Sequence, residues 1–200
     1  MLTDDSYELL RQLASPVVAI TCASGGRVNG MILDSAVRAS ISPRVPRLSV
    51  YIHKWHLSHE FVWRTGRYGL HLLDRSQFDL VYQLGFVTGR EKDKMRDIPY
   101  RIGESGVPCL MECYAAFECR VINTMDAGAS TFFLADVVAT HRGPGTTVLS
   151  ADYFRKNLPE KWREGFAANY REAQDRIAAT SAIVINPWPG PEEEFTKKER

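Results

Sequence analysis

The sequence has no excess of charge of either sign. Its 200 residues carry 25 lysines and arginines against 24 aspartates and glutamates, which gives a formal net charge of +1. A nucleic-acid-binding domain or a polybasic membrane-surface protein needs a concentration of positive charge that this balance does not supply. The composition therefore favours a small-molecule partner, and we expect neither a nucleic-acid nor a membrane partner.

Signals for secretion and for membrane insertion are also missing. The opening residues MLTDDSYELLRQLASP are acidic where a signal peptide is basic, and no apolar segment follows them. No later run approaches the roughly 18 to 20 apolar residues that a membrane span requires. The sequence thus predicts a cytoplasmic protein.

The four cysteines are not spaced like a disulfide framework, so we expect them to stay reduced. Cys109, Cys113 and Cys119 suggest a metal site, but an extended chain rises about 3.3 Å per residue. Cys109 and Cys113 would then lie roughly 13 Å apart, and Cys113 and Cys119 roughly 20 Å apart. They share a metal only if the chain folds back, and we expect no metal.

The common catalytic motifs are absent as well. The chain contains no Gly-x-Ser-x-Gly, His-Glu-x-x-His, Gly-x-Gly-x-x-Gly or Walker sequence. His53, His56 and His59 recur every third residue, whereas a zinc-binding helix places histidines at i and i+4. Because these three cross a strand end, a loop and a helix start, their side chains should diverge, and an anion site is favoured over a metal.

Hydrophobic periodicity predicts a mainly β chain with flanking helices. Expected helices cover 3–14, 58–64, a segment capped by Asp74 or Ser76, and a final segment beginning at Pro159. Expected strands cover 17–23, 27–33, 36–42, 48–53, 68–73, 107–123, 130–140 and 181–185. Hairpins are expected at Ser24-Gly25-Gly26 and across 124–129, and Thr65-Gly66 should end the helix over 58–64. The apolar stripe of the final helix, which includes Trp162 and Phe166, should serve packing. Residues 187–200 form a Pro-rich and charged tail without means of burying itself.

The end of the strand at 48–53 is a candidate anion site. A helix N-terminus offers free backbone N–H groups and a favourable dipole to negative charge. Here Lys54 supplies a point charge, Ser58 a hydroxyl donor, and His59 lies near the free N–H groups. Phosphate is the expected ligand; the alternative is that Ser58 only caps the helix.

Several motifs follow one another in a set order. They are Gly30-Met31 with Asp34-Ser35, then Ser40-x-Ser42-Pro43-x-x-Pro46, the loop 53–59, and Glu118-Cys119-Arg120-Val121 ahead of Asp126-Ala127-Gly128. This succession, over about residues 10–142, resembles the flavin reductase-like family of FMN-binding split barrels. The resemblance implies an α+β fold that is mainly β, a split β-barrel of the FMN-binding type, in one domain over 1–186. The barrel core would cover about 10–142 and a C-terminal helical extension about 150–180.

The resemblance also implies a set of cofactor-binding residues. They are Asp34, Ser35, Ala36, Ser40, Ile41, Ser42, His53, Lys54, Ser58, His59, Thr88, Gly89 and Lys94. The residues over 34–42 are otherwise ordinary turn and strand-surface positions, and the loop 88–94 is otherwise a solvated connection. No catalytic side chain is expected, because the flavin carries the hydride chemistry.

As a family member, the protein should transfer a hydride from NAD(P)H to FMN, with FAD as the alternative. The reduced flavin would pass to oxygen, an oxygenase partner or another acceptor, and the protein would be a homodimer. Two positions depart from the family: Asp34 replaces Asn, Ser or Thr, and Gly128-Ala129-Ser130 replaces Gly-Asp-His. The second departure leaves open a flavin-binding carrier or sensor without turnover. An enzyme that reduces a specific organic substrate with tightly held FMN is the further alternative.

Overall fold

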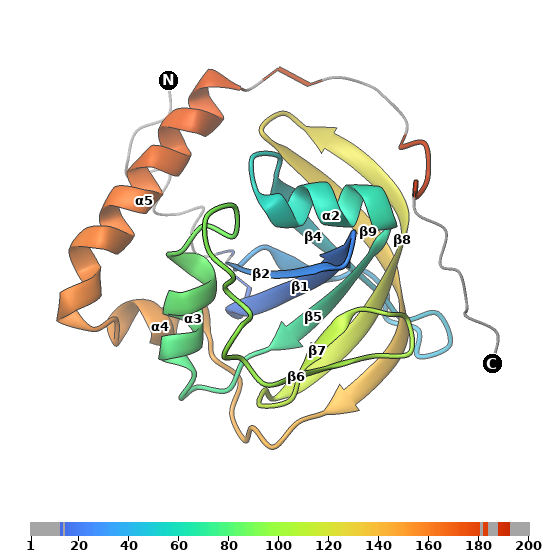
Figure 1. The fold of residues 1–200 in the computed structure, drawn as a ribbon, viewed down its shortest axis with the longest axis horizontal. Coiled ribbons are helices and arrows are strands. Elements are labelled where there is room, and N and C mark those ends of the chain that lie inside the picture. Colours follow the sequence, from blue (N-terminus) through green and yellow to red (C-terminus); the bar gives the residue numbers. More distant parts are fainter. Residues whose placement is uncertain (1–12, 14, 181, 184–187, 193–200) are drawn as a thin grey trace.

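The computed structural model describes residues 13, 15–180, 182–183 and 188–192 (Figure 1). Its strands are β1 Val18–Ser24, β2 Arg27–Leu33, β3 Ala36–Arg38, β4 Arg47–His53, β5 Arg67–Leu72, β6 Tyr100–Ile102, β7 Pro108–Leu110, β8 Ala115–Ala127 and β9 Ser130–Arg142. Its helices are α2 Leu57–Thr65, α3 Phe78–Gly85, α4 Ala151–Lys156 and α5 Glu160–Ala179. The predicted helix over 3–14 and strand over 181–185 fall largely outside the described residues.

The main sheet is antiparallel and curled. Its strand order is β2-β1-β5-β8-β9-β4-β3, so the two edge strands are β2 and β3. Only Asp34 and Ser35 separate these edge strands in the chain. The sheet must therefore curl until its two edges meet at that point, which makes a barrel that is split along one side (Figure 1). The predicted split β-barrel with flanking helices is confirmed.

Tight glycine turns set the register of the two hairpins that build this sheet. Gly25 and Gly26 have φ values of 56° and 74° and join β1 to β2. Gly128 has φ 75° and opens the turn between the long strands β8 and β9. Positive φ is nearly free of cost only for glycine. Both predicted hairpins are therefore confirmed, although β8 runs through Ala127 and the second turn is shorter than the predicted 124–129.

Two predicted strands differ from the structure. The strand expected over 36–42 ends at Arg38, because the hydroxyls of Ser40 and Ser42 accept hydrogen bonds from backbone N–H groups two residues later. The strand expected over 107–123 is two strands, β7 and β8. The chain changes sheets between them, since β7 pairs with β6 whereas β8 pairs with β5 and β9.

The predicted helix caps are wrong at the N-termini and right at the C-terminus of α2. Helix α2 begins one residue before Ser58, and α3 begins after Gln77. The Asp74 carboxylate accepts instead from Ser76 and from the backbone of residues 146 and 147, which holds its pKa well below the usual range. Gly66 ends α2 in the left-handed conformation, as expected.

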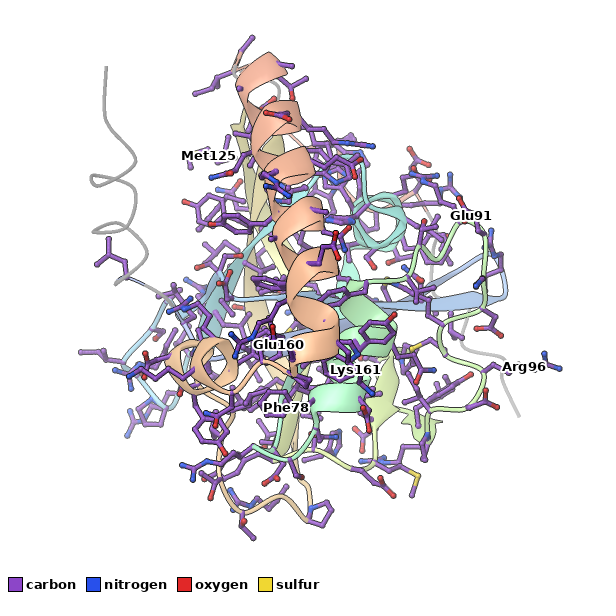
Figure 2. The ribbon with its side chains drawn as sticks, turned by 90° about the vertical axis from the view of Figure 1, so that its left-hand side faces the viewer. Phe78, Glu91, Arg96, Met125, Glu160 and Lys161 are labelled. Carbon is purple, nitrogen blue, oxygen red and sulfur yellow. The ribbon has the colours of Figure 1, made fainter. Side chains whose placement is uncertain are left out.

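Two apolar clusters fill the molecule. One lies inside the barrel under α2, and the other joins α3, α4 and the start of α5 to the outer side of β1 and β2. Trp162 of α5 stacks on Tyr82 of α3, with ring centroids 4.8 Å apart. Figure 2 shows α5 lying lengthwise along this face, with its first residues Glu160 and Lys161 near Phe78. Phe166 also contacts Phe154 of α4, with ring centroids 6.0 Å apart, so the predicted packing stripe is confirmed for Trp162 and Phe166, whereas Ile177 at its far end is 40% exposed.

The tail is only partly as expected. Trp188 packs against the barrel cluster, and its indole N–H donates to the carbonyl oxygen of Trp63 at 3.2 Å. The N–H of Glu192 donates to the carbonyl oxygen of Arg64 at 2.7 Å. The prediction that this tail does not bury itself is thus wrong for 188–192, because the tryptophan supplies the apolar contact.

Candidate functional site

The loop 88–94 rests directly on β2. A Cβ atom added to Gly89 would lie 2.1 Å from Oδ1 of Asn29, so only glycine permits this approach. Arg27 donates to the carbonyl oxygen of Gly89 at 3.3 Å. Gly89 and Lys94 are buried, whereas Thr88 is exposed. Gly89 and Lys94 anchor the loop against the barrel, while residues 88 and 90–93 are exposed, so the alternative of a solvated connection holds for most of the loop.

Ser58 lies beneath this loop, inside α2. Its side chain is fully buried, and its hydroxyl accepts a hydrogen bond of 2.8 Å from Nδ2 of Asn29. The interpretation of Ser58 as the helix cap is therefore wrong, since its hydroxyl is turned to β2 rather than to the first turn. Asn29 contacts a predicted site residue but was not itself predicted. Its position directly before the Gly30-Met31 motif is the only sequence feature that could have indicated it.

Lys94 is the most constrained cation of the site. It is 7% exposed, and its ammonium group donates to the carbonyl oxygen of Leu84 in the last turn of α3 at 2.6 Å. Burial lowers its pKa from 10.5 to about 8, against the opposing effect of Cys22. Among the described residues, no carboxylate lies within ion-pair distance of this ammonium group. A buried cation without a carboxylate is a ready partner for an anion.

His56, at the start of α2, is surrounded by positive and titratable groups. Burial is the largest cause that lowers its pKa to about 4, and His53, Lys94, His59 and Arg176 lower it further through charge repulsion. The structure thus gathers the cations of three distant segments around one imidazole at a helix N-terminus. An anion bound there would relieve that repulsion.

Helix α5 contributes to this cluster from outside the barrel. The guanidinium carbon of Arg176 lies 5.7 Å from the ring centroid of Trp55, in cation–π range. Trp55 in turn stacks on His53, with centroids 4.3 Å apart and rings 9° from parallel. No sequence pattern marks Arg176, because the apolar stripe of a helix does not predict which loop the end of that helix contacts.

Lys54 and His59 lie on the other side of α2. The ammonium group of Lys54 is 2.8 Å from both carboxylate oxygens of Asp126, so its charge is already paired. His59 Nε2 is 2.8 Å from Oγ1 of Thr131, and burial, followed by Lys54, lowers the pKa of His59 to about 4. They line a cavity of about 390 Å³ together with Glu60, Trp63, Arg64, Thr124, Asp126, Thr131 and Glu192. The cavity holds charges of both signs and does not include Lys94.

His53 connects β4 to the turn of the β8–β9 hairpin. Its Nδ1 lies 2.7 Å from Oγ of Ser130, its partner in the β4–β9 ladder. Burial lowers the pKa of His53, and the charge of Asp34 opposes that shift. Asp34 therefore lies close enough to His53 to influence it, which links the connection between β2 and β3 to the histidine loop.

The remaining predicted residues follow the split of the barrel. The hydroxyl of Ser35 donates to the carbonyl oxygen of Tyr51 at 3.1 Å, and Ala36 pairs with Val50. Ile41 is 90% exposed, and Ser40 and Ser42 bond only within their own turn. The structure thus groups the predicted residues into the edge 34–36, the exposed turn 40–42, the Lys94–His56 cluster and the Lys54–His59 cavity.

These groups suit a phosphorylated, partly planar ligand. Lys94 offers positive charge for a phosphate beside the neutral imidazole of His56, whereas the guanidinium group of Arg176 already pairs with Glu172 at 2.6 Å. The edge 34–36 offers backbone groups and short polar side chains. Within the described part of the chain, no helix is long and apolar enough to cross a bilayer.

Comparison with known proteins identifies the family. The model of the flavin reductase like domain matches residues 10–158. The chain is 32% identical over 130 residues to a high molecular weight rubredoxin of Moorella thermoacetica, covering 64% of this chain and 56% of that protein. It is 25% identical over 149 residues to a ferric-chelate reductase (NAD(P)H) of Archaeoglobus fulgidus, covering 73% and 87%. The chain thus spans little more than half of the first relative and most of the second.

Solved structures agree with this assignment. An FMN-binding protein from Thermus thermophilus with bound p-hydroxybenzaldehyde superimposes with a TM-score of 0.61 at 27% identity, covering 66% of this chain and 74% of that one. Flavoredoxin from Methanosarcina acetivorans shares the fold, with a TM-score of 0.61 at 24% identity over 66% and 70%. The family match ends before α5, so this helix lies outside the matched domain. Because the family model matches about three quarters of its length, the chain belongs to the flavin reductase-like family.

Proposed function

We propose that this protein is a flavin-dependent oxidoreductase that binds FMN and transfers a hydride to it from NAD(P)H. One observation carries the proposal: in a chain of this family, the buried ammonium group of Lys94 donates to the carbonyl oxygen of Leu84, and no carboxylate among the described residues pairs with it. A phosphate group supplies the missing negative charge. FAD is the alternative cofactor, because its phosphates would satisfy the same cations.

The residues of the cluster would share the work of binding. Lys94 and His56 would hold the phosphate, and Arg176 would add less from α5, because Glu172 already pairs with it. The edge of Asp34, Ser35 and Ala36, with the turn 40–42, would bind the polar edge of the ring system. Lys54 would serve less than the sequence predicted, because Asp126 already pairs with it.

Bound flavin would supply the redox chemistry, accepting a hydride from NAD(P)H and giving its electrons to oxygen, an oxygenase partner or another acceptor. The side chains of the protein would orient the two reactants and exclude water. His53 is relevant to whether the protein uses NAD(P)H. Its imidazole contacts Ser130, which occupies the position of the histidine in the family's Gly-Asp-His motif. An imidazole from the neighbouring strand is thus available near that position, which supports NAD(P)H as co-substrate.

We propose a homodimer as the working form. Apolar side chains are exposed along β3, the turn that follows it and β4: Val37 by 55%, Ile41 by 90%, Val45 by 45% and Tyr51 by 41%. Exposed apolar groups that cluster on an edge strand favour burial against a partner. All four cysteines are free thiols, which supports the cytoplasm as the location.

A carrier or sensor that holds flavin without turnover is the second candidate, favoured by Gly128-Ala129-Ser130. Anaerobic stopped-flow mixing of the FMN-loaded protein with NADH or NADPH separates the two. The oxidoreductase bleaches its bound flavin with at least one nicotinamide. A flavin that dithionite reduces but neither nicotinamide does would overturn the proposal and leave the carrier.

The same sample distinguishes a dedicated enzyme from a supplier of reduced flavin. Helix α5 reaches Trp55 from outside the matched domain, which favours flavin retention and a specific organic substrate. Gel filtration of the reduced protein under anaerobic conditions measures the flavin that stays bound. A reductase that serves a partner releases it, whereas a dedicated enzyme does not.

A further inference from the structure

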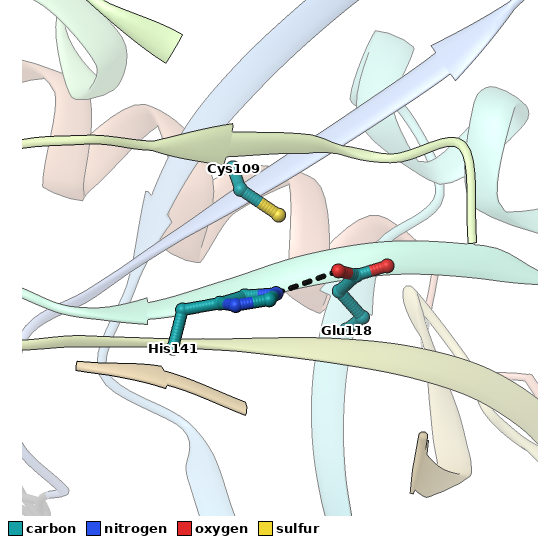
Figure 3. A group of neighbouring side chains, drawn as sticks. All are labelled: Cys109, Glu118 and His141. Atoms are coloured by element: carbon teal, nitrogen blue, oxygen red, sulfur yellow. Dashed lines mark hydrogen bonds and ion pairs between the residues drawn. The ribbon is translucent and has the colours of Figure 1, made fainter. Parts of the chain in front are cut away.

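Three side chains of different chemistry meet at the end of the barrel away from the loop 88–94. Cys109 of β7, Glu118 of β8 and His141 of β9 each direct one possible ligand atom to a common point, and these atoms all lie within 4.8 Å of one another. Figure 3 shows the thiol of Cys109 pointing toward the pair formed by Glu118 and His141. We propose that these three residues bind a divalent metal ion of the zinc type.

The sheet register brings the carboxylate and the imidazole together. Glu118 pairs with Ala139 and Ala116 pairs with His141, so Glu118 and His141 are diagonal neighbours across the β8–β9 ladder. A register shift directly after Glu118 re-aims the strand at that residue. The Nε2 atom of His141 lies 2.7 Å from Oε1 of Glu118. Both side chains therefore face β7, where Cys109 completes the group.

The carboxylate of Glu118 is held in the way that metal-binding carboxylates are held. Its Oε2 accepts from the backbone N–H and the hydroxyl of Ser105, at 2.7 and 2.5 Å. A Cβ atom on Gly103 would lie 2.3 Å from Oε1, so the loop fits closely around the carboxylate only because residue 103 is glycine. Oε2 is thus fixed by Ser105, while Oε1 accepts a longer bond of 3.3 Å from the N–H of Glu104 and faces His141. Outer hydrogen bonds of this kind orient carboxylates that bind metals.

The ligand set is one that zinc prefers. A thiolate, an imidazole and a carboxylate bind zinc at about 2.3, 2.0 and 2.1 Å, which in a tetrahedron puts the ligand atoms about 3.3 to 3.8 Å apart. The observed separations of up to 4.8 Å, and 2.7 Å for the hydrogen-bonded pair, bracket that range. Modest side-chain rotations would therefore assemble the site.

Charge and protons also balance. On binding, the Cys109 thiol would release its proton to solvent, and His141 would bind as a neutral imidazole through Nε2 with its proton on Nδ1. One thiolate, one carboxylate and a divalent cation sum to zero, which suits a site whose carboxylate is fully buried. His141 is 25% exposed at its side chain, which gives the ion a path from solvent.

The fourth position would be left to water. His71 is the nearest further imidazole in the barrel, but its Nε2 accepts from the N–H of Leu110 and its Nδ1 lies 3.3 Å from the carbonyl oxygen of Ala19. With three protein ligands, the ion would also fasten the small β6–β7 sheet to the main sheet. We expect this to stabilise the fold independently of flavin binding.

The test uses the full chain, freed of flavin and metal, and titrated with Co²⁺ as a spectroscopic substitute for zinc. We expect one Co²⁺ per chain, with a thiolate-to-cobalt charge-transfer band and the intense visible bands of a tetrahedral site. Zn²⁺ should displace the cobalt and raise the melting temperature. Cys109→Ser should abolish the charge-transfer band, and His141→Gln should weaken binding by about tenfold or more.

Cys113→Ser is the matched control, because the Cys113 thiol is as buried as that of Cys109 but lies outside the cluster. It should keep the full cobalt spectrum, and both cysteine variants should keep FMN retention. Cobalt bound below one equivalent, or a spectrum without a thiolate band, would overturn the proposal. So would a Cys113→Ser variant that loses the band as completely as Cys109→Ser.

Discussion

Replacing Lys94 by methionine should make the flavin-free protein more stable at pH 7. The ammonium group is 7% exposed, and burial lowers its pKa from 10.5 to about 8. A shift of this size means that the buried charge lowers the free energy of unfolding by about 3 kcal/mol at pH 7. Methionine fills similar space without charge but leaves the carbonyl oxygen of Leu84 without its donor, which costs about 1 to 2 kcal/mol.

The net expectation is a gain of about 1 to 2 kcal/mol, or a rise of about 2 to 8 °C in melting temperature for a chain of this length. The pH dependence fixes the cause. Because the folded-state pKa of Lys94 lies below its unfolded value, the unfolded wild type binds more protons between about pH 8 and 10.5. The free energy of unfolding of the wild type should therefore rise relative to that of Lys94→Met through this pH window, until the two proteins are about equally stable.

Urea unfolding of both proteins at pH 7, 8, 9 and 10 measures this gap. Lys92→Met is the control, because Lys92 is exposed on the same loop and its loss should change stability by less than about 0.5 kcal/mol. A Lys94→Met protein that is less stable than wild type at pH 7, with a gap independent of pH, would refute the reasoning. Lys94 would then act chiefly as a cap on the end of α3.

Three further predictions concern the surroundings of this site. The pKa of His56 is lowered from 6.5 to about 4, so its contribution to the free energy of unfolding is complete above pH 6.5 and is lost as the pH falls toward 4. In urea unfolding, His56→Gln should therefore reduce the loss of stability over this window by about 1 to 3 kcal/mol. Gly89→Ala should lower the melting temperature and weaken FMN binding, because the added Cβ would collide with Asn29. Gly165→Ala, in open space on α5, should instead stabilise the fold by about 0.5 to 1 kcal/mol. Equal effects of the two variants would contradict the close contact between Gly89 and Asn29. Lys54→Ala breaks an exposed pair with Asp126 and should cost less than about 1 kcal/mol while leaving FMN retention on desalting near that of wild type; a colourless variant would return the phosphate to Lys54.

Local patterns in the sequence predicted most of the barrel. Alternating apolar residues and glycine turns placed β1 with β2 and β8 with β9, and a left-handed Gly66 ended α2 where expected. The failures lie where distant contacts decide. Serine is a common helix cap, yet the hydroxyl of Ser58 accepts a hydrogen bond from Asn29, which lies 29 residues earlier in the chain. This contact holds the Ser58 side chain in the interior.

The candidate site shows the same division. The residue types of the histidine segment suit an anion and predict its role, whereas the loop 88–94 is predicted only by the resemblance to the family. Arg176 was missed, because its place beside Trp55 depends on how α5 docks onto α3. The cluster of Cys109, Glu118 and His141 was missed for a related reason: the rise of an extended strand separates nearby cysteines, while strand pairing brings in a histidine from the next strand.

The most direct test of this account compares FMN with riboflavin, which lacks the phosphate. Quenching of flavin fluorescence measures both affinities for the wild type, Lys94→Met and Lys92→Met. The account predicts that the wild type and Lys92→Met bind FMN far more tightly than riboflavin, and that Lys94→Met binds both about equally. An unchanged preference for FMN in Lys94→Met would contradict the assignment of the phosphate to the Lys94–His56 cluster.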